Sequence, residues 1–383
     1  TPHSSLLTLM IYLDYAATTP LDKAVLEAML PYFTEHYGNV SSFHSAGQKA
    51  RRGVENAREQ VAAAIGATRK EIVFTSGATE ADNQAIRSVA QMRPNGHIIT
   101  SSIEHAAVLS TCKYLETLGH SVTFLKPDER GEITVQSVAD AVRSDTVLIA
   151  LMRINNETGI KTDIASISQL AHEKGILVFC DAVQAFGFEN LNVNELGVDL
   201  LSLSGHKIYG PKGVGVLYIR EGLELPAFML GGEQERGFRA GTHNTPGIVG
   251  MGKVAELAVQ SLGGISELEK LRDDFEKQLL KVKGVKANGS APKGPKHINV
   301  RVADVDGEAL LLSLDRLGVC ASAGSACAAG SLEPSHVLTA MGLSPEQAKA
   351  SVRFSLGRGV TKEILNEAAK RFAEAVERCR VFA

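Results

Sequence analysis

Short apolar runs alternate with amphipathic stretches through the middle of the chain. The runs are rich in Val, Ile, Leu and Phe and are nearly continuous, as in strands that are buried on both faces of a parallel sheet. Amphipathic segments at 79–92, 106–118 and 164–174 lie between them and predict helices. The predicted strands are residues 71–76, 97–101, 122–125, 147–152, 176–180, 199–204 and 214–219.

The pattern changes after about residue 262. A charged helical stretch at 266–282 is followed by a strand at 297–302, a helix at 307–318 and a final helix at 361–378. We therefore predict an α/β protein with a mainly parallel, seven-stranded sheet and a smaller α+β domain. The predicted division assigns residues 21–262 to the large domain, 10–20 plus 263–383 to the small domain, and 1–9 to an N-terminal extension.

Composition narrows the class of protein. The 383 residues carry 40 Lys and Arg against 43 Asp and Glu, with 44% hydrophobic and 22% charged residues. These values are typical of a soluble globular protein, and they exclude a disordered chain, a fibre and a binder that attracts nucleic acid through bulk positive charge. Five scattered cysteines form no disulfide or zinc pattern, and residues 1–10 lack the basic segment of a signal peptide. We expect a cytoplasmic protein that needs neither membrane, nucleic acid nor metal.

Polar residues follow five of the predicted strands. They are Ala78-Thr79, Glu104-His105, Asn155-Asn156, Asp181 with Gln184, and His206-Lys207. Ligands bind beyond the carboxyl ends of strands in parallel α/β sheets, so we expect these residues to share one edge of the sheet.

The segment Ser76–Thr79 joins a strand to a predicted helix through Gly77. A glycine there lets a ligand approach the backbone, and the unpaired N–H groups of a helix N-terminus attract an anion such as a phosphate. The alternative is a plain capped helix that binds nothing.

Lys207 stands at the end of an apolar strand, within Ser204-Gly-His-Lys207 and before Gly210-Pro-Lys-Gly213. A lysine held there can lose hydration, which lowers the pKa of its amine and favours an imine with a carbonyl. Together with Asp181 and the phosphate-binding turn, it suits pyridoxal 5'-phosphate, whose ring accepts electrons when a carboxylate keeps the pyridine nitrogen protonated. His105 would stack on that ring, or would only cap a helix.

Cys327 lies in a stretch of small residues, 321–331, that has little to pack and is expected to be mobile and exposed. A cysteine in such a loop differs from a buried structural cysteine and is a candidate nucleophile. Cys112, Cys180 and Cys379 fit structural roles, and Cys320 is compatible with either interpretation. Arg353 occupies an apolar strand-like stretch, where it would bind a carboxylate or form an ordinary ion pair.

With these residues assembled, the sequence resembles the class I cysteine desulfurases of the NifS/IscS type, which belong to the class-V aminotransferase family. The matching segments are YLDYAATTP (12–20), YGNVSSFHSAGQ (37–48), EIVFTSGATEADN (71–83), EHAAV (104–108), INNETG (154–159), DAVQ (181–184), SLSGHKIYGPKGVG (202–215), RAGTHN (239–244), SAGSACAAGSLEPSHVL (322–338) and VRFSLGRG (352–359).

The resemblance implies a fold-type I, pyridoxal-phosphate-dependent homodimer that converts L-cysteine into L-alanine. Lys207 would bind the cofactor, Asp181 and Gln184 would contact its ring, and Cys327 would take the sulfur as a persulfide for an iron–sulfur scaffold or another acceptor. His105 would stack on the ring and transfer protons. The resemblance also implies phosphate contacts by Ala78, Thr79, Ser204 and His206, a contact of Thr242 with the partner's phosphate, a place for Asn156 beside cofactor and substrate, and substrate binding by Arg353 and Asn39.

Two positions depart from the family pattern. Val40 stands where related sequences often have proline, and Ala328 follows Cys327 where Ser or Thr is common. Both leave the chemistry intact. The alternatives are a selenocysteine lyase, another aminotransferase-family enzyme, or a degenerate scaffold that only binds assembly partners. The segment His243-Asn244-Thr245-Pro246 resembles the nitrogen-fixation branch as much as the housekeeping branch.

Overall fold

A computed structural model describes residues 10–323 and 333–381, with the backbone alone at Val381. The predicted extension at 1–9 and the candidate nucleophile Cys327 lie outside the described residues. The largest sheet has seven strands in the order β2-β8-β7-β6-β5-β3-β4. Strand β8 is antiparallel to β2 and β7, and the other neighbours pair in parallel. The strands are β2 (Ile72–Thr75), β3 (His97–Ser101), β4 (Ser121–Leu125), β5 (Thr146–Met152), β6 (Leu177–Asp181), β7 (Leu200–Ser204) and β8 (Gly215–Ile219).

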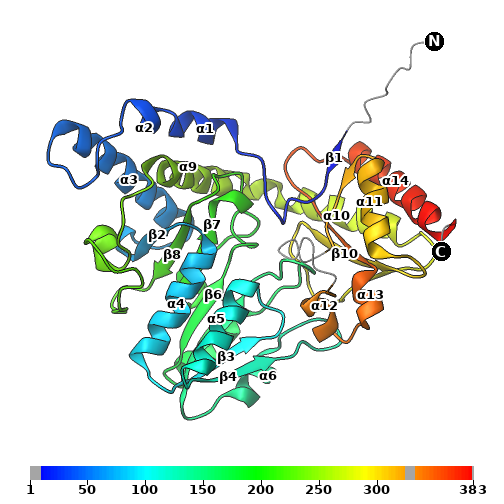
Figure 1. The fold of residues 1–383 in the computed structure, drawn as a ribbon, viewed down its shortest axis with the longest axis horizontal. Helices are drawn as coiled ribbons and strands as arrows, with labels where there is room; N and C mark the ends of the chain where they lie inside the picture. Colours follow the sequence, from blue (N-terminus) through cyan, green and yellow to red (C-terminus); the bar gives the residue numbers. More distant parts are fainter. Residues whose placement is uncertain (1–9, 324–332, 382–383) are drawn as a thin grey trace.

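All seven predicted strands are therefore present, and the predicted α/β class with a mainly parallel sheet is confirmed. Helices cover both faces of this sheet (Figure 1). Helices α4 (Ala78–Met92) and α5 (Ala106–Thr117) pack on one face. The opposite face is covered by α1 (Lys23–Met29), α3 (Ser45–Ala64), α6 (Val135–Ala141), α7 (Ile164–His172), α8 (Val193–Leu196) and α9 (Thr245–Ser261).

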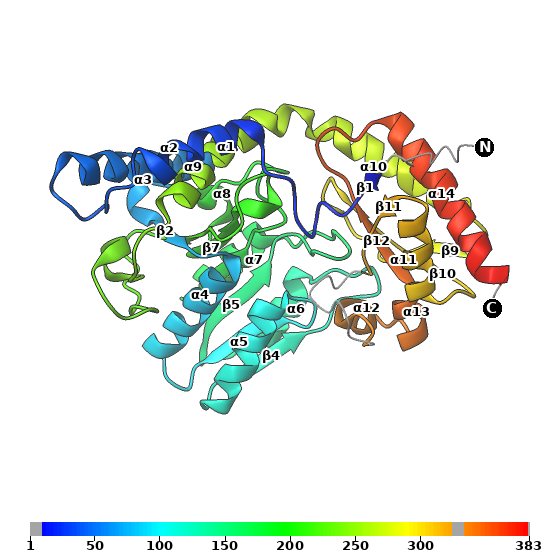
Figure 2. The ribbon, with the colours of Figure 1, turned by 45° about the horizontal axis from the view of Figure 1, so that its top comes forward.

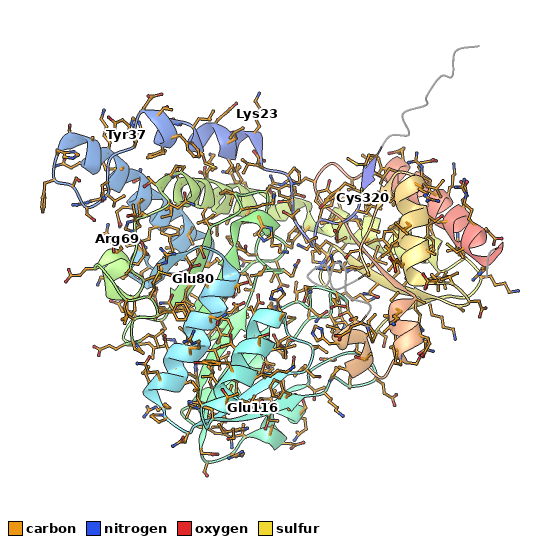
Figure 3. The ribbon with its side chains drawn as sticks, in the orientation of Figure 1. Lys23, Tyr37, Arg69, Glu80, Glu116 and Cys320 are labelled. Carbon is orange, nitrogen blue, oxygen red and sulfur yellow. The ribbon has the colours of Figure 1, made fainter. Side chains whose placement is uncertain are left out.

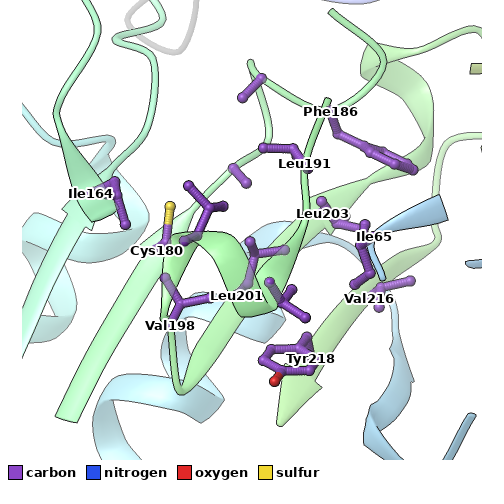
Figure 4. Packing of buried hydrophobic residues seen from close by; sticks show 14 of the residues in the cluster. Ile65, Ile164, Cys180, Phe186, Leu191, Val198, Leu201, Leu203, Val216 and Tyr218 are labelled. Atoms are coloured by element: carbon purple, nitrogen blue, oxygen red, sulfur yellow. The ribbon is translucent and has the colours of Figure 1, made fainter. Parts of the chain in front are cut away.

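The strands divide their side chains between these two helix layers. Along β7, Leu200 packs toward α4 and α5, whereas Leu201 and Leu203 join the core under α7 to α9. Figure 4 shows the second of these cores, with Cys180 and Tyr218 among the aliphatic side chains. Because both faces are buried, the strands need no polar positions, which explains their continuous apolar runs.

A separate core lies at the other end of the molecule (Figure 2). It is formed by a three-stranded antiparallel sheet, β12-β10-β9, together with a parallel pair, β1-β11. The strands are β1 (Ile11–Tyr12), β9 (Val285–Ala287), β10 (His297–Val302), β11 (Val319–Cys320) and β12 (Ser351–Ser355). Helices α10 (Ile265–Leu279), α11 (Gly307–Arg316) and α14 (Lys362–Val381) pack on it. The domain boundaries given above stay a prediction.

Short helices complete the chain: α2 (Pro31–Thr34), α12 (His336–Ala340) and α13 (Pro345–Lys349), with 3₁₀ turns η1 (Arg69–Glu71), η2 (Gly205–Lys207), η3 (Gln234–Gly237) and η4 (Leu262–Gly264). None of the helices within the described ranges is long and apolar enough to cross a membrane.

The N-terminal segment joins the two cores. Ile11 and Tyr12 pair with β11, and the Asp14 backbone bridges to Ser355 of β12. A few residues later, the Thr19 N–H donates to the carbonyl of His206, directly after the large sheet. This crossing places residues 16–18 beside Lys207.

Candidate active site

A cavity of about 830 Å³ opens at the carboxyl ends of the parallel strands. It lies between the large sheet and strand β12 of the second core. Ten predicted site residues line it: Ala78, Thr79, His105, Asn156, Asp181, Gln184, Ser204, His206, Lys207 and Arg353. The expectation that separate strand ends meet at one edge of the sheet is confirmed.

Lys207 ends the 3₁₀ turn η2, directly after strand β7. Its half-buried side chain reaches the N-terminal segment, where Nζ donates to the carbonyl oxygens of Ala16, at 2.9 Å, and Ala17, at 2.6 Å. The turn is tight, because a Cβ on Gly205 would lie 2.9 Å from the carbonyl oxygen of Pro211. The amine is thus fixed at the cavity wall by a rigid strand end and two backbone acceptors.

The N-terminus of α4 forms another wall of the cavity. Its N-cap residue is Gly77, whose side-chain position is open: a Cβ there meets no atom within 4 Å. Among the described residues no side chain caps the helix, so its first N–H groups are left for a ligand beside Ala78 and Thr79. Ser204 and His206 lie on the same cavity, which gives it the donors and the helix dipole that bind an anion.

His206 is neutral at physiological pH. Burial, with the nearby charges of Lys207 and Lys212, lowers the pKa of its imidazole to about 4. Nδ1 lies 3.1 Å from the hydroxyl of Thr18, which fixes the ring. His206 therefore offers a hydrogen bond without adding a full charge.

Asp181 is the last residue of β6, in register with Ser202 of β7. Its Oδ1 accepts from the Val183 N–H at 3.0 Å. Burial raises the pKa of this carboxyl, while that hydrogen bond and the nearby His105 and Lys207 favour the carboxylate. A cation in the cavity would favour the carboxylate further.

The helix-capping interpretation of His105 is confirmed, and its stacking on a ring stays a prediction. Its Nδ1 accepts from the Ala107 N–H at 3.2 Å and so caps α5, and the ring also lines the cavity. Arg353, which is 1% exposed on β12, forms an ion pair with Asp14 at 2.8 Å and donates to the Asn156 carbonyl at 2.8 Å. The ion pair expected of Arg353 exists, and the guanidinium still borders the cavity.

Two predicted residues do not line this cavity. Asn39 and Thr242 are both exposed, and the Oδ1 of Asn39 accepts from the Ser41 N–H. The predicted contact of Thr242 is with a partner's site, so its position outside its own cavity is compatible with that contact.

Comparison with known proteins identifies the family. The sequence matches the family described as "Aminotransferase class-V" over residues 11–367. It is 48% identical to "Cysteine desulfurase IscS" of Dictyoglomus turgidum, an alignment that covers 97% of this chain and 95% of that protein. The chain belongs to the class-V aminotransferases.

Solved structures agree with this assignment. A "NIFS-LIKE PROTEIN" aligns with a TM-score of 0.90 and 36% identity over 97% of this chain and 100% of its own. A structure described as "SspA in complex with cysteine" aligns with a TM-score of 0.79 and 41% identity over 90% and 98% of the two chains. The fold is the fold-type I of pyridoxal-phosphate enzymes, and members of this family depend on that cofactor.

The cavity of this class-V aminotransferase fits pyridoxal phosphate. Beyond the open helix N-terminus, two buried oxygens at the cavity, Asn156 Oδ1 and Gln184 Oε1, have no hydrogen-bond partner within the described part of the chain. Buried polar atoms in proteins are normally bonded, so such oxygens indicate that a polar ligand belongs there.

Two buried carboxyls at the cavity were not among the predicted site residues. Asp82 and Glu157 are each 1% exposed. Burial raises the pKa of both, well above the ordinary value for Asp82, and Glu157 Oε2 accepts from the Ser335 hydroxyl at 2.5 Å. Both lie inside the matching segments 71–83 and 154–159. Their position in those segments was the available signal, but an acid in a helical pattern, as at Asp82, or in a loop, as at Glu157, is normally interpreted as solvent-exposed.

Lys296 is buried close behind the site, and no carboxylate of the described residues pairs with it. It is fully enclosed, its Nζ lies 3.8 Å from the ring centroid of Phe188, and no described residue forms a hydrogen bond with it. Burial, with the charges of Lys207 and Arg353, lowers the pKa of its amine well below the ordinary value. Burial therefore favours the neutral amine of this lysine over the ammonium ion.

Lys296→Met is expected to stabilise the protein. Between the lowered pKa of the native state and the ordinary pKa of 10.5, the unfolded chain binds a proton that the folded chain does not, so the stability of the wild type falls as pH falls. The variant should gain roughly 1–3 kcal/mol near neutral pH. The gain should grow toward acid pH by up to about 1.4 kcal/mol per pH unit. Urea unfolding at several pH values measures it, with the exposed Lys270→Met as control. A gain that is independent of pH would contradict a neutral Lys296.

Proposed function

We propose that this protein is a pyridoxal-phosphate-dependent cysteine desulfurase. It converts L-cysteine into L-alanine and leaves the sulfur on Cys327 as a persulfide, which passes to an iron–sulfur scaffold or another acceptor. The observation that carries this proposal is a single cavity that holds the Lys207 amine, the buried Asp181 carboxyl and the Arg353 guanidinium. The 48% identity to a protein named cysteine desulfurase supports it independently.

Each residue has a role that its geometry supports. When bound, the cofactor supplies a ring that accepts electrons from the substrate. Asp181 would keep a proton on the pyridine nitrogen, Gln184 would contact the ring oxygen, and His105 would cover the ring. Lys207 would carry the cofactor and move the proton of the substrate α-carbon. Ala78, Thr79, Ser204 and His206 would hold the phosphate, and Arg353 and Asn156 would orient the substrate.

Cys327 would act as the nucleophile. Its thiolate forms a bond with the substrate sulfur, the carbon–sulfur bond breaks, and the electron pair of that bond passes to the carbon framework that becomes alanine. The four described cysteines do not suit this role, because burial raises the pKa of every one of them and favours the unreactive thiol.

A homodimer would complete the site. Large apolar side chains are exposed on α2 and on the chain that follows it, including Phe33 at 58%, Tyr37 at 75% and Phe43 at 88%. Figure 3 labels Tyr37 in this region. Exposed apolar patches of this kind mark interfaces. A second copy seated there would allow Thr242, and by the same reasoning Asn39, to reach the cavity of the partner.

One assay tests the proposal: alanine and sulfide are measured together from L-cysteine, with and without a candidate scaffold protein. We expect equal amounts of the two products under reducing conditions. Activity with selenocysteine alone, or amino transfer to a keto acid without sulfide, would favour the alternative enzymes. Absence of the visible absorbance of a lysine-bound cofactor would favour a degenerate scaffold.

Asp181→Asn is expected to lower kcat/KM by about 10²- to 10³-fold while the cofactor stays bound, because an amide cannot hold the proton on the pyridine nitrogen. Steady-state kinetics with cofactor absorbance measure this, and the exposed Asp145→Asn is the matched control. Unchanged kinetics in the Asp181 variant would remove this carboxyl from the mechanism.

A further inference from the structure

The segment 231–243 carries Thr242 and has an unusual backbone. Glu235 and Arg236 are consecutive non-glycine residues in the left-handed region, with φ of 49° and 57°. Such a conformation is costly for residues with a Cβ and persists only when surrounding contacts enforce it. Other contacts must therefore hold this turn.

A buried ion pair holds the first part of the segment. Arg58 of α3 and Glu235 are 3% and 5% exposed, and the guanidinium meets the carboxylate through two parallel hydrogen bonds of 2.7 and 2.8 Å. The Phe74 N–H donates to the same carboxylate at 2.9 Å. This bidentate geometry fixes the orientation of the Glu235 carboxylate as well as its position.

The same carboxylate fixes the residue beside Thr242. His243 Nε2 lies 2.8 Å from Glu235 Oε1, so that one carboxylate joins α3, β2 and the end of the segment. Burial alone would raise the pKa of Glu235, but the hydrogen bonds from Arg58 and His243 outweigh it and lower this pKa to about 2. Glu235 is thus ionised at every pH at which the protein would work.

A second tie connects the segment to the phosphate end of the cavity. Arg239 forms an ion pair with Glu80 at 2.7 Å, and Glu80 Oε2 accepts from the Ser76 N–H at 3.0 Å. Glu80 lies in the first turn of α4, next to Thr79 (Figure 3). Glu80 itself lines the cavity. The segment is therefore anchored at both 235 and 239 before the chain reaches Thr242.

We infer that Arg58, Glu235 and His243 are positioning residues that present Thr242 to the phosphate of the cofactor in the partner subunit. The inference rests on the proposed cofactor and homodimer. It follows from three features together: a strained turn, a buried carboxylate that joins three elements, and a threonine left exposed immediately beside it. The three residues of one protomer thus act on the cofactor site of the other protomer, which supplies its own Lys207 and Asp181.

The first test compares two forms of the cofactor. Glu235→Gln removes the charge that holds Arg58 and His243, and the affinity of the apoenzyme for pyridoxal phosphate should fall about 10- to 100-fold. Pyridoxal lacks the phosphate, so its affinity should change little, and Thr242→Val should reproduce this pattern. The matched control is Glu276→Gln on α10, which breaks the ion pair between Glu276 and Lys293. Equal losses for both cofactor forms would overturn the inference, since that result indicates a general structural role.

The second test separates action across the dimer from action within one chain. One heterodimer carries Glu235→Gln and Lys207→Ala on the same protomer, and the other carries them on opposite protomers. The intact Lys207 reports cofactor binding through its visible absorbance. In the first heterodimer, the site with the intact Lys207 receives Thr242 from the protomer that carries Glu235→Gln, so we expect weak cofactor binding. In the second heterodimer, that site receives Thr242 from a protomer with an unchanged Glu235, so we expect normal binding. The reverse pattern would overturn the inference.

A third variant changes a partly exposed side chain, so it is less disruptive to the fold than a change at the buried Glu235. Arg239→Gln removes the second tie at a partly exposed side chain and should also reduce the preference for pyridoxal phosphate over pyridoxal. A preference equal to that of the wild type would count against the segment as a positioning device. If the wild type itself binds neither form, the proposed function fails, and this result is distinct from every outcome above.

Discussion

Replacing Lys207 by alanine is expected to reduce sulfide release from L-cysteine by at least about 10³-fold. The wild-type amine is held at the end of β7 by two carbonyl oxygens of the N-terminal segment, at 2.9 and 2.6 Å. Alanine offers neither an amine to carry the cofactor nor a base for the proton of the substrate. The variant should also lose the visible absorbance of a lysine-bound cofactor. An absorbance spectrum therefore tests the prediction without an assay of turnover.

The phosphate-binding wall does not depend on this side chain. Ala78, Thr79 and Ser204 keep their places, so Lys207→Ala should still bind pyridoxal phosphate non-covalently and release it on dialysis. The control is Lys70→Ala, an exposed lysine paired with Glu221, which should behave as wild type. Sustained turnover by the Lys207 variant would show that another amine carries the chemistry.

The large sheet could be predicted from local pattern alone. Its strands are buried on both faces, so each appears in the sequence as an apolar run. The bounds of all seven predicted strands lie within one residue of the observed bounds. The helix predicted at 106–118 and the strand at 297–302 are likewise present as α5 and β10. The antiparallel direction of β8 was not specified by the pattern, because an apolar run has no intrinsic direction.

The candidate site could be located because one physical rule covers most of it. Strand ends of a parallel sheet meet at one edge, and this brings His105, Asp181 and Lys207 to a common cavity. The contribution of β12 needed the resemblance, since no local rule brings Arg353 from the second core to that edge.

Contacts between distant segments could not be predicted. The carbonyls of Ala16 and Ala17 that hold Lys207 come from a segment about 190 residues away in sequence. The Arg58–Glu235 pair and the enclosed Lys296 depend in the same way on the tertiary fold. A charged residue inside a polar pattern is normally interpreted as solvated, and only burial in the folded chain gives these residues their roles.

Cys327→Ala is expected to abolish sulfide release while leaving the cofactor absorbance and its response to L-cysteine intact. We expect this result because the cavity residues bind and activate the substrate, whereas only the Cys327 thiol accepts the sulfur. Loss of both absorbance and turnover would instead indicate a damaged fold. Mass spectrometry of the wild type after exposure to L-cysteine should show a gain of one sulfur atom that the variant lacks.

The matched control is Cys320→Ala, because Cys320 lies on β11, close in sequence to the same stretch of small residues. Burial raises the pKa of its thiol, and the negative charges of Asp315 and Asp14 raise it further. The thiolate that is needed for attack is therefore disfavoured. We therefore expect Cys320→Ala to retain wild-type turnover and to gain the same sulfur atom. If the two variants exchanged these results, the sulfur would be accepted on β11, at a residue tied to the second core, and transfer to an acceptor would require the acceptor to reach that core.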